Sequence, residues 1–570
     1  MKKIIPVLIA IVLIVIIAVS TFGAKIYERY SYSQERADLY EYFDLYSDTD
    51  MAIFVQNERL PQKAQYVNGE VYFDLDFVHE QFNPRFYLDE SEELLLFTTP
   101  TEIIKTAIGT DSYQVTQGVT AEGEPAVESR PYTLCYRAGE TVYVAAKWVA
   151  EHSSLSYETF TEPNRMELKT GAHEYTRGVI SSNTAVRHRG GVKSPILTDI
   201  SEGEEVVVIE QMEEWSKVKT KDCFIGYVEN KRLKDIETAT SDETPSTYVE
   251  PVYPNISKDY KINLVWHQIY APQDGSSLKE ALSGTSGINT VSPTVFSLSD
   301  NEGNFTSIAT RDYVDTAHAM GIEVWALIDN FNEAVSTQEL LSSMTARENL
   351  RRNIVNAVKE YGFDGINIDF EQVPMQAGLD FIQFIRELSV DCRLNQIILS
   401  IDNYVPTEYT DHYDRAEQGK VADYVIIMGY DEHYSGSDAG SVASIDFVSG
   451  GIADTVSKVP EEKVINALPY YTRIWKTEGG NVTCEAVGMG AAKNFLSQNG
   501  VEAAWDEATC QNYAEFQKGD VFYQVWLEDE ESIQTKLNVM NQYKLAGVAG
   551  WKLGLEKAYV WDLIGGYLEQ

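Results

Sequence analysis

Two patterns of apolar residues alternate through residues 258–570. Short apolar runs with strand character recur eight times. They are separated by segments in which apolar residues recur every three to four positions, as on one face of a helix. The predicted strands are Ile262–Gln268, Thr290–Leu298, Glu323–Asp329, Gly365–Glu371, Gln396–Ile401, Tyr424–Tyr430, Lys463–Leu468 and Gly547–Leu553. Eight strand–helix units over about 300 residues predict a (β/α)8 TIM barrel, in which functional side chains lie at the carboxyl ends of the strands.

The fourth predicted strand is polar along one face. Because side chains alternate across a strand, Asn367, Asp369 and Glu371 share one face, and the apolar residues between them share the other. Polar side chains in so apolar a strand are costly unless they bond to one another or to a ligand. Taken alone, the stretch also fits a solvated edge strand. At the mouth of a barrel, such a row of carboxyl and amide groups predicts an acid–base site, with Glu371 at the end of its strand.

An internal repeat occupies residues 51–174, where a strand, a short amphipathic helix and further strands occur twice. Val71-Tyr72 in the first copy corresponds to Val142-Tyr143 in the second. Phe77-Val78 then corresponds to Trp148-Val149 at the same spacing. The pattern predicts an α+β module without a cluster of catalytic groups, and we expect a spacer or a binding module.

Short strands separated by turns follow at residues 178–234, and they predict a small all-β barrel. Residues 235–257 are rich in Thr, Ser, Glu and Pro and lack apolar periodicity. This composition predicts a linker between the all-β barrel and the (β/α)8 barrel.

The chain begins with Met1-Lys2-Lys3 and an apolar run from Ile4 to Ala24. The run is long enough to cross a bilayer, and the two lysines favour a cytoplasmic N-terminus. Residues 1–25 are therefore predicted to be a membrane anchor, with a cleaved signal peptide as the alternative. In both cases the rest of the chain lies outside the cell membrane. Residues 26–50, rich in Tyr and charged residues, are predicted to form a stalk.

Composition narrows the choice of partners. The 570 residues exceed what a single core holds, and the net charge of −41 argues against nucleic acid as a partner. The five cysteines lack metal-ligand spacing, so neither a metal nor another cofactor is expected. Cys484 and Cys510 flank one late segment and are candidates for a disulfide, although five free thiols fit the sequence equally well.

The segment Asp364–Glu371 resembles the D-x-x-D-x-D-x-E signature of family 18 glycoside hydrolases, the chitinase-like enzymes. Later segments are similar to the family in the same order: Met428-Gly429-Tyr430-Asp431, Leu468–Arg473 and Trp551. The resemblance covers residues 258–570. Asn367 stands where the signature has its second Asp. That replacement and the stretch Trp526–Ser532 are similar to the branch that cleaves bacterial wall and spore-cortex glycan.

The resemblance implies a retaining mechanism in which the acetamide oxygen of the substrate attacks the anomeric carbon. Glu371 would be the acid, Asp369 would accept a hydrogen bond from the acetamide N–H, and Tyr430 would donate one to the acetamide oxygen. Because neighbouring carboxyl groups do not both ionise cheaply, one pKa is expected to rise. The expected substrate-binding residues are Asn367, Asp364, Met428, Asp431, Tyr471, Trp551 and Glu528. Tyr470 competes with Tyr471 for the aromatic position of the family. Other residues near strand ends are either groove-lining or surface residues: Asp329, Asn330 and His433.

Residues 51–174 resemble the modules related to the N-terminal domain of copper amine oxidases, and residues 178–234 resemble the bacterial SH3-type domain. Together the resemblances imply an extracellular glycoside hydrolase, held at the membrane or secreted, that acts on a β-1,4-linked glycan with N-acetylglucosamine. Peptidoglycan of the cell wall is the preferred substrate and chitin the alternative. A non-catalytic protein that binds wall glycan through the same barrel is the competing hypothesis.

Overall fold

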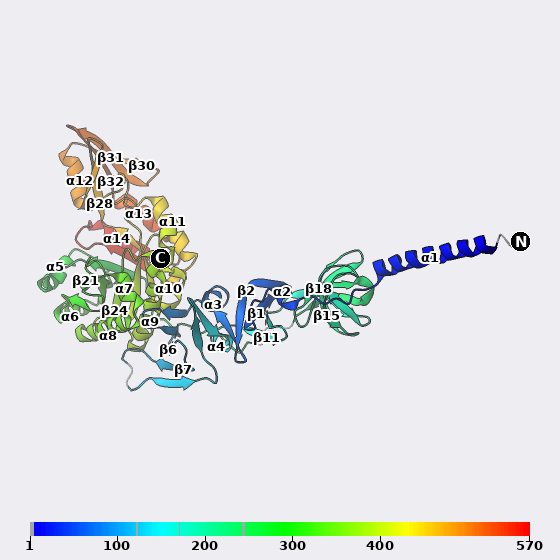
Figure 1. Cartoon of the computed structure of the whole chain (residues 1–570). Coiled ribbons are helices and arrows are strands. Elements are labelled where there is room, and N and C mark those ends of the chain that lie inside the picture. Colours follow the sequence, from blue (N-terminus) through cyan, green and yellow to red (C-terminus); the bar gives the residue numbers. More distant parts are fainter. Residues whose placement is uncertain (1–4, 121–122, 170, 242–245, 570) are drawn as a thin grey trace. The chain divides into compact units, whose positions relative to one another are not determined.

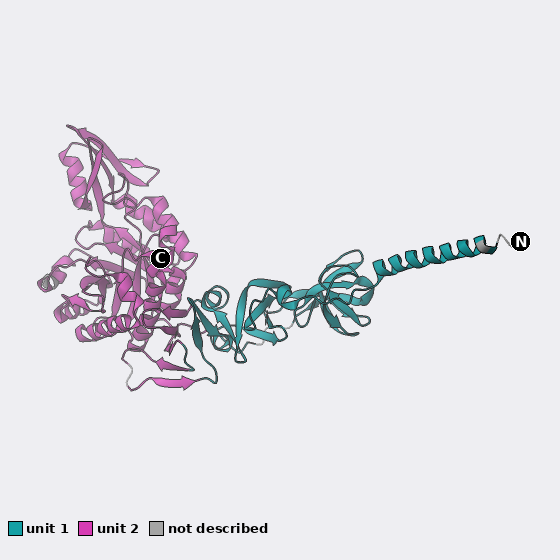
Figure 2. Ribbon diagram, viewed as in Figure 1, with its two compact units in different colours: residues 1–84, 109–111, 130–250 teal, residues 85–108, 112–129, 251–570 magenta. Residues whose placement is uncertain are grey.

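The computed structural model describes residues 5–120, 123–169, 171–241 and 246–569 (Figure 1). The charged start of the predicted anchor, Met1-Lys2-Lys3, and residues 242–245 of the predicted linker lie outside the described residues. The chain forms two compact units (Figure 2). Unit 1 comprises Met1–Pro84, Gly109–Asp111 and Arg130–Glu250, and unit 2 comprises Arg85–Ile108, Ser112–Ser129 and Pro251–Gln570.

Unit 2 is built on a closed parallel barrel, which confirms the predicted barrel. Its strands, in order around the barrel, are β20 (Ile262–His267), β21 (Thr290–Leu298), β23 (Glu323–Asp329), β24 (Gly365–Asp369), β25 (Ile398–Tyr404), β26 (Tyr424–Met428), β27 (Val464–Pro469) and β33 (Gly547–Trp551). Pairing of β20 with both β21 and β33 closes the ring. A short strand, β22 (Phe305–Ser307), adds to β21 in antiparallel sense.

The helices of unit 2 follow the barrel strands in sequence. They are α5 (Leu278–Ala281), α6 (Arg311–Ala319), α7 (Thr337–Ser342), α8 (Met344–Tyr361), α9 (Gly378–Asn395), α10 (Arg415–Val421), α11 (Ile445–Val456), α13 (Glu530–Met540) and α14 (Tyr559–Leu568). Local chemistry sets the ends of α8. The Ser343 side chain caps its first turn by accepting from the Ala346 amide, and Gly362 ends it at a φ of 81°. This turn leads directly into β24.

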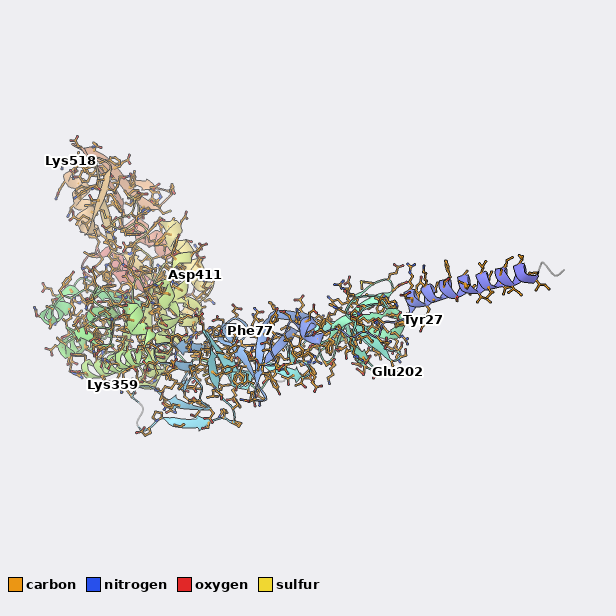
Figure 3. The ribbon with its side chains drawn as sticks, in the orientation of Figure 1. Tyr27, Phe77, Glu202, Lys359, Asp411 and Lys518 are labelled. Atoms are coloured by element: carbon orange, nitrogen blue, oxygen red, sulfur yellow. The ribbon has the colours of Figure 1, made fainter. Side chains whose placement is uncertain are left out.

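A small antiparallel sheet is inserted between β27 and β33, and the sequence analysis did not anticipate it. Its strands are β28 (Tyr471–Glu478), β29 (Asn481–Gly488), β30 (Ala504–Asp506), β31 (Gln511–Lys518) and β32 (Val521–Leu527), with α12 (Met489–Gln498) after β29. Lys518, labelled in Figure 3, ends β31 at the hairpin to β32. Cys484 lies in β29 and Cys510 precedes β31. Both are free thiols, as are the other three cysteines, so the candidate disulfide is not formed.

A second antiparallel sheet belongs to unit 2 although it comes from the predicted α+β module. Its strands are β4 (Phe86–Asp89), β5 (Leu94–Thr98), β6 (Ile103–Ala107), β7 (Ser112–Thr116) and β8 (Ala126–Ser129). Leu96 and Ile103 of this sheet share a hydrophobic cluster with Met344 of α8 and Val390 of α9. The predicted module is thus divided between the two units.

Unit 1 contains two seven-stranded sheets. The first consists of β1 (Asp50–Val55), β2 (Glu58–Val67), β3 (Glu70–Asp74), β9 (Cys135–Ala138), β10 (Thr141–Ala145), β11 (Ser156–Phe160) and β12 (Arg165–Lys169), with α3 (Leu75–Gln81) and α4 (Ala146–Glu151). The second consists of β13 (Glu174–Ile180), β14 (Thr184–Arg187), β15 (Ile196–Ile200), β16 (Glu205–Gln211), β17 (Trp215–Thr220), β18 (Ile225–Glu229) and β19 (Leu233–Thr240). The order strand–helix–strand–strand occurs twice, as β3–α3–β4–β5 and as β10–α4–β11–β12.

Two predicted boundaries shift at the ends of unit 1. Helix α1 (Ile5–Tyr30) is long and apolar enough to cross a membrane, but the predicted stalk after it is not a free connection. It contains α2 (Leu39–Phe43), and Phe43 is buried in one core with Val186 and Val218. The first residues of the predicted linker belong to β19, because its backbone pairs with β13.

Candidate active site

A cavity of about 350 Å³ opens at the carboxyl ends of the barrel strands. The residues expected from the sequence that line it are Asp369, Glu371, Met428, Tyr430, Asp431 and Trp551. Asp329, which the sequence left open between a groove-lining and a surface position, also lines the cavity. The other lining residues include Trp266, Phe331, Asp402 and Tyr404. With Thr294 of β21, seven of the eight barrel strands contribute to one site, as the barrel fold leads us to expect.

Asp369 ends β24, and only 6% of the residue is exposed. Its Oδ1 atom is buried without a hydrogen-bond partner among the described residues. Burial raises the pKa of Asp369 well above its ordinary value, and the neighbouring carboxyl groups of Asp402, Glu371 and Asp329 raise it further. A buried acceptor without a donor is costly, and a ligand that brought a donor to this atom would remove that cost.

Glu371 lies two residues beyond the end of β24 and not in the strand, which corrects the prediction. Asn330 holds its backbone, because the Glu371 amide donates to Asn330 Oδ1 at 2.9 Å and Asn330 Nδ2 donates to the Glu371 carbonyl at 2.8 Å. The Tyr404 hydroxyl donates to Glu371 Oε2 at 2.7 Å. Burial raises the pKa of Glu371, the bond from Tyr404 opposes that rise, and Asp431 adds to it. The outcome is a pKa above the ordinary value, as a proton donor requires.

Asp402 and Tyr404 are site residues that the sequence analysis missed. Both belong to β25, whose predicted end at Ile401 left them in a loop. A signal was present, because Ser400, Asp402 and Tyr404 alternate as the polar residues of β24 do. Asp402 is 3% exposed. Burial raises its pKa well above the ordinary value despite a hydrogen bond from Asn367.

Asn367 lies beneath the cavity and not on its wall. It is fully buried, and its Oδ1 accepts from Trp266 Nε1 at 2.9 Å and from Ser292 Oγ at 3.2 Å. Its Nδ2 donates to Ser400 Oγ at 3.0 Å and to Asp402 Oδ1 at 2.8 Å. Among the described residues, Asn367 therefore orients its neighbours and does not reach the cavity itself.

Tyr430 and Asp431 follow β26 and form one group with residues of β28. The Tyr471 hydroxyl donates to Asp431 Oδ1 at 2.6 Å, and Arg473 Nη2 donates to the same oxygen at 2.8 Å. The ring of Tyr471 packs edge-on against Tyr430 at 6.1 Å between centroids. Burial raises the pKa of Tyr430, so its hydroxyl keeps its proton and remains a donor. Tyr471 supports Tyr430 and Asp431 from behind the cavity wall, while Tyr470 is fully buried.

Two expected substrate-binding residues lie elsewhere. Asp364 precedes β24 at the opposite end of the barrel, where its Oδ2 lies 2.8 Å from His318 Nε2 and accepts from the Val324 amide at 2.8 Å. Glu528 follows β32 and is 1% exposed. Both of its oxygens lie 3.0 Å from Lys536 Nζ. Neither residue lines the cavity, because each is held by a local partner. His433 also lies outside the lining and contacts the Asp438 carbonyl.

Fold and site define a barrel enzyme whose buried carboxyl groups are suited to acid–base chemistry. Residues 259–556, more than half of the chain, match the glycosyl hydrolases of family 18. The chain belongs to this family and is a glycosyl hydrolase.

Relatives of this chain include named bacterial enzymes. It is 27% identical over 310 residues to the uncharacterized glycosylase YvbX of Bacillus subtilis (strain 168), a match that covers 52% of this chain and 89% of that protein. It is 27% identical over 248 residues to the cortical fragment-lytic enzyme of Bacillus anthracis, covering 42% of this chain and 57% of that one. The solved spore cortex-lytic enzyme SleL of Bacillus megaterium QM B1551 is similar at 20% identity and a TM-score of 0.49, covering 57% of this chain and 79% of that one.

Proposed function

We propose that the protein cleaves β-1,4 bonds in a glycan that contains N-acetylglucosamine, with retention and with help from the acetamide of the substrate. One observation carries the proposal: an unpartnered, buried Asp369 Oδ1 faces the same cavity as Glu371, whose pKa burial raises. An acetamide N–H is the donor that Asp369 lacks. A glycosidic oxygen is the acceptor that a protonated Glu371 needs.

In the first step Glu371 gives its proton to the leaving oxygen while the acetamide oxygen bonds to the anomeric carbon. The bond to the leaving sugar breaks, and an oxazolinium ion forms. Asp369 accepts from the acetamide N–H and balances the positive charge, and the Tyr430 hydroxyl donates to the acetamide oxygen. In the second step the oxygen of a water molecule attacks the anomeric carbon while the Glu371 carboxylate takes a proton from that water. This step restores the protonated acid and the acetamide.

Aromatic side chains complete the proposed sugar site. Trp551 ends β33 and lines the cavity, and its ring lies 5.9 Å from that of Trp266 between centroids. Such a pair offers a flat apolar floor for a sugar face. Met428 and Asp431 line the same cavity and are proposed to contact the sugar beside Tyr430.

Peptidoglycan is the preferred substrate in this proposal, because relatives of the chain are named for lysis of cortical fragments. Helix α1 is proposed to be the membrane anchor, or else a signal peptide, and either places the barrel outside the cell membrane. The strands at residues 178–234 are proposed to be an SH3-type module, and residues 51–174 a module like the N-terminal domain of copper amine oxidases. Both are proposed to hold the enzyme against the wall.

The test is to incubate the full chain with defined peptidoglycan and chitin oligomers and to identify the products by mass spectrometry. Cleavage of peptidoglycan in preference to chitin is expected. Glu371→Gln should abolish cleavage, whereas Glu360→Gln, at an exposed position of α8, should leave it unchanged. Cleavage by Glu371→Gln at the wild-type rate would show that another residue is the acid. Binding of either polymer without products at any pH would favour a non-catalytic wall protein.

A further inference from the structure

Asp369 and Asp402 lie at corresponding positions of two neighbouring strands, and their carboxyl groups are close enough for their charges to interact. In the parallel pairing of β24 with β25, Asn367 lies opposite Ser400. Two residues further along each strand are Asp369 and Asp402, whose side chains point to the same face because the period is two. Both are nearly fully buried and both line the cavity. The barrel thus brings two carboxyl groups together below the position proposed for the acetamide.

The surroundings of this pair are acidic. Among the described residues that line the cavity there is no Lys, Arg or His. The titratable groups that face the pair from the surrounding elements are acids or phenols: Glu371, Asp329, Asp431, Tyr404 and Tyr430. Two carboxyl groups in such surroundings do not both ionise cheaply, and burial raises the pKa of each.

Asn367 determines which oxygen of Asp402 carries a proton. Trp266 Nε1 only donates, so the Asn367 oxygen must face it and the Asn367 amino group must face Asp402. Asp402 Oδ1 is therefore an acceptor, which leaves Oδ2 for the proton. Asn367 also stands where the signature of the family has its second Asp, so β24 lacks one carboxyl group that β25 supplies.

We propose that Asp402 is the proton partner of Asp369, and that it replaces from β25 the carboxyl group that Asn367 removes from β24. One proton is shared by the two groups, and their combined charge is −1 throughout. When the acetamide N–H approaches, the proton moves from Asp369 to Asp402 Oδ2, and Asp369 becomes the anion that the oxazolinium ion needs. Asp402 acts through Asp369 and is a positioning residue. The inference rests on the function proposed above and adds a residue to it.

The test compares three full-length proteins on the oligomer that the wild type cleaves. Asp402→Asn should lower kcat on the order of tenfold to a hundredfold with little change in KM, as is usual for an outer residue that tunes an inner one. It should also move the alkaline limb of kcat/KM to lower pH, because the wild-type pair gains a second charge when it loses its shared proton at alkaline pH, and that charge raises the pKa of Glu371. The double variant Asn367→Asp/Asp402→Asn returns the carboxyl group to β24. It should recover most of kcat and the wild-type pH limb.

Each result decides the inference. A wild-type pH profile and kcat for Asp402→Asn would overturn it, and so would a double variant no better than Asp402→Asn. If Asp402→Asn fails to fold, the double variant alone decides, because it keeps the number of carboxyl groups. Wild-type turnover that is lost in Glu371→Gln shows that the proposed function holds, so failure of the exchange would then count only against Asp402.

Discussion

Two regions of unit 2 bury carboxyl groups in opposite electrostatic surroundings. At the mouth of the barrel, Asp369 and Asp402 lie among other acids, with no cation among the described residues of the lining, and burial raises the pKa of both. Beside α9 and α10, Glu417 lies between Arg386 Nε at 2.8 Å and Arg85 Nε at 2.7 Å. Burial acts to raise the pKa of Glu417, but the two arginines outweigh it and lower the pKa to about 2.

The difference separates a structural role from a chemical one. Glu417 stays ionised and ties the residue before β4 to α9 and α10, so the small sheet is held on the barrel by an ion triad. Arg347 makes a similar link between Glu387 and Asp89. Asp391 is intermediate, because burial raises its pKa although Arg351 lies 2.6 Å away. Carboxyl groups without a cation keep protons available for reaction, and those with two cations hold elements together.

The largest effect on stability is expected from Glu417→Gln. It removes the carboxylate that Arg85 and Arg386 both contact, and breaking a buried ion pair costs about 3–5 kcal/mol. The unfolding midpoint in urea should fall, and amide hydrogen exchange in β5 and β6 should speed up. Asp402→Asn should lose no stability at neutral pH, since it removes an acid from a site without cations. A loss under 1 kcal/mol for Glu417→Gln would show that the triad does not hold the sheet.

The two regions should also respond to pH in opposite directions. The folded-state pKa of Glu417 lies below its unfolded value of about 4.3, so its contribution is present above that pH and is lost as the pH falls toward about 2. Asp369 and Asp402 have raised folded-state pKa values. Their contribution is complete below the unfolded value of about 3.9 and is lost as the pH rises through the folded-state values.

Thermal melts from pH 2 to pH 8 measure both effects. Glu417→Gln should flatten the acid side of the curve of Tm against pH, and Asp402→Asn should flatten the decline at higher pH. The exposed change Glu360→Gln should leave both sides as in the wild type. If Glu417→Gln and Asp402→Asn changed the same side of the curve of Tm against pH, the contrast between the two regions would be wrong.

The sequence predicted the barrel because its strands are short apolar runs, and it predicted Asp369 and Glu371 because polar residues alternate within one such run. It missed Asp402 because the apolar run of β25 ends at Ile401, and the polar alternation that continues to Tyr404 gains its meaning only from the pairing with β24. It placed Glu528 at the substrate because a linear motif does not show that Lys536, in the helix that follows Glu528 directly, binds the carboxylate. Likewise, a repeat pattern does not show that β4 and β5 pack on a barrel that comes much later in the chain.

The smallest effect on activity is expected from Tyr404→Phe. This variant tests a second neighbour of Glu371 at the mouth of the barrel, for comparison with Asp402→Asn. The change removes the hydroxyl that donates to Glu371 Oε2 at 2.7 Å and keeps the ring, which packs against Tyr413. Because this hydrogen bond lowers the pKa of Glu371, its loss should raise that pKa. The alkaline limb of kcat/KM should then move to higher pH by up to about one unit, since one charge-assisted bond is worth about 1.5 kcal/mol. This shift is opposite to the one expected for Asp402→Asn.

Tyr409→Phe, at an exposed tyrosine of the following segment, is the matched control and should leave the alkaline limb of kcat/KM in place. A limb that moves to lower pH in Tyr404→Phe would mean that the tyrosine stabilises the protonated acid and not the carboxylate.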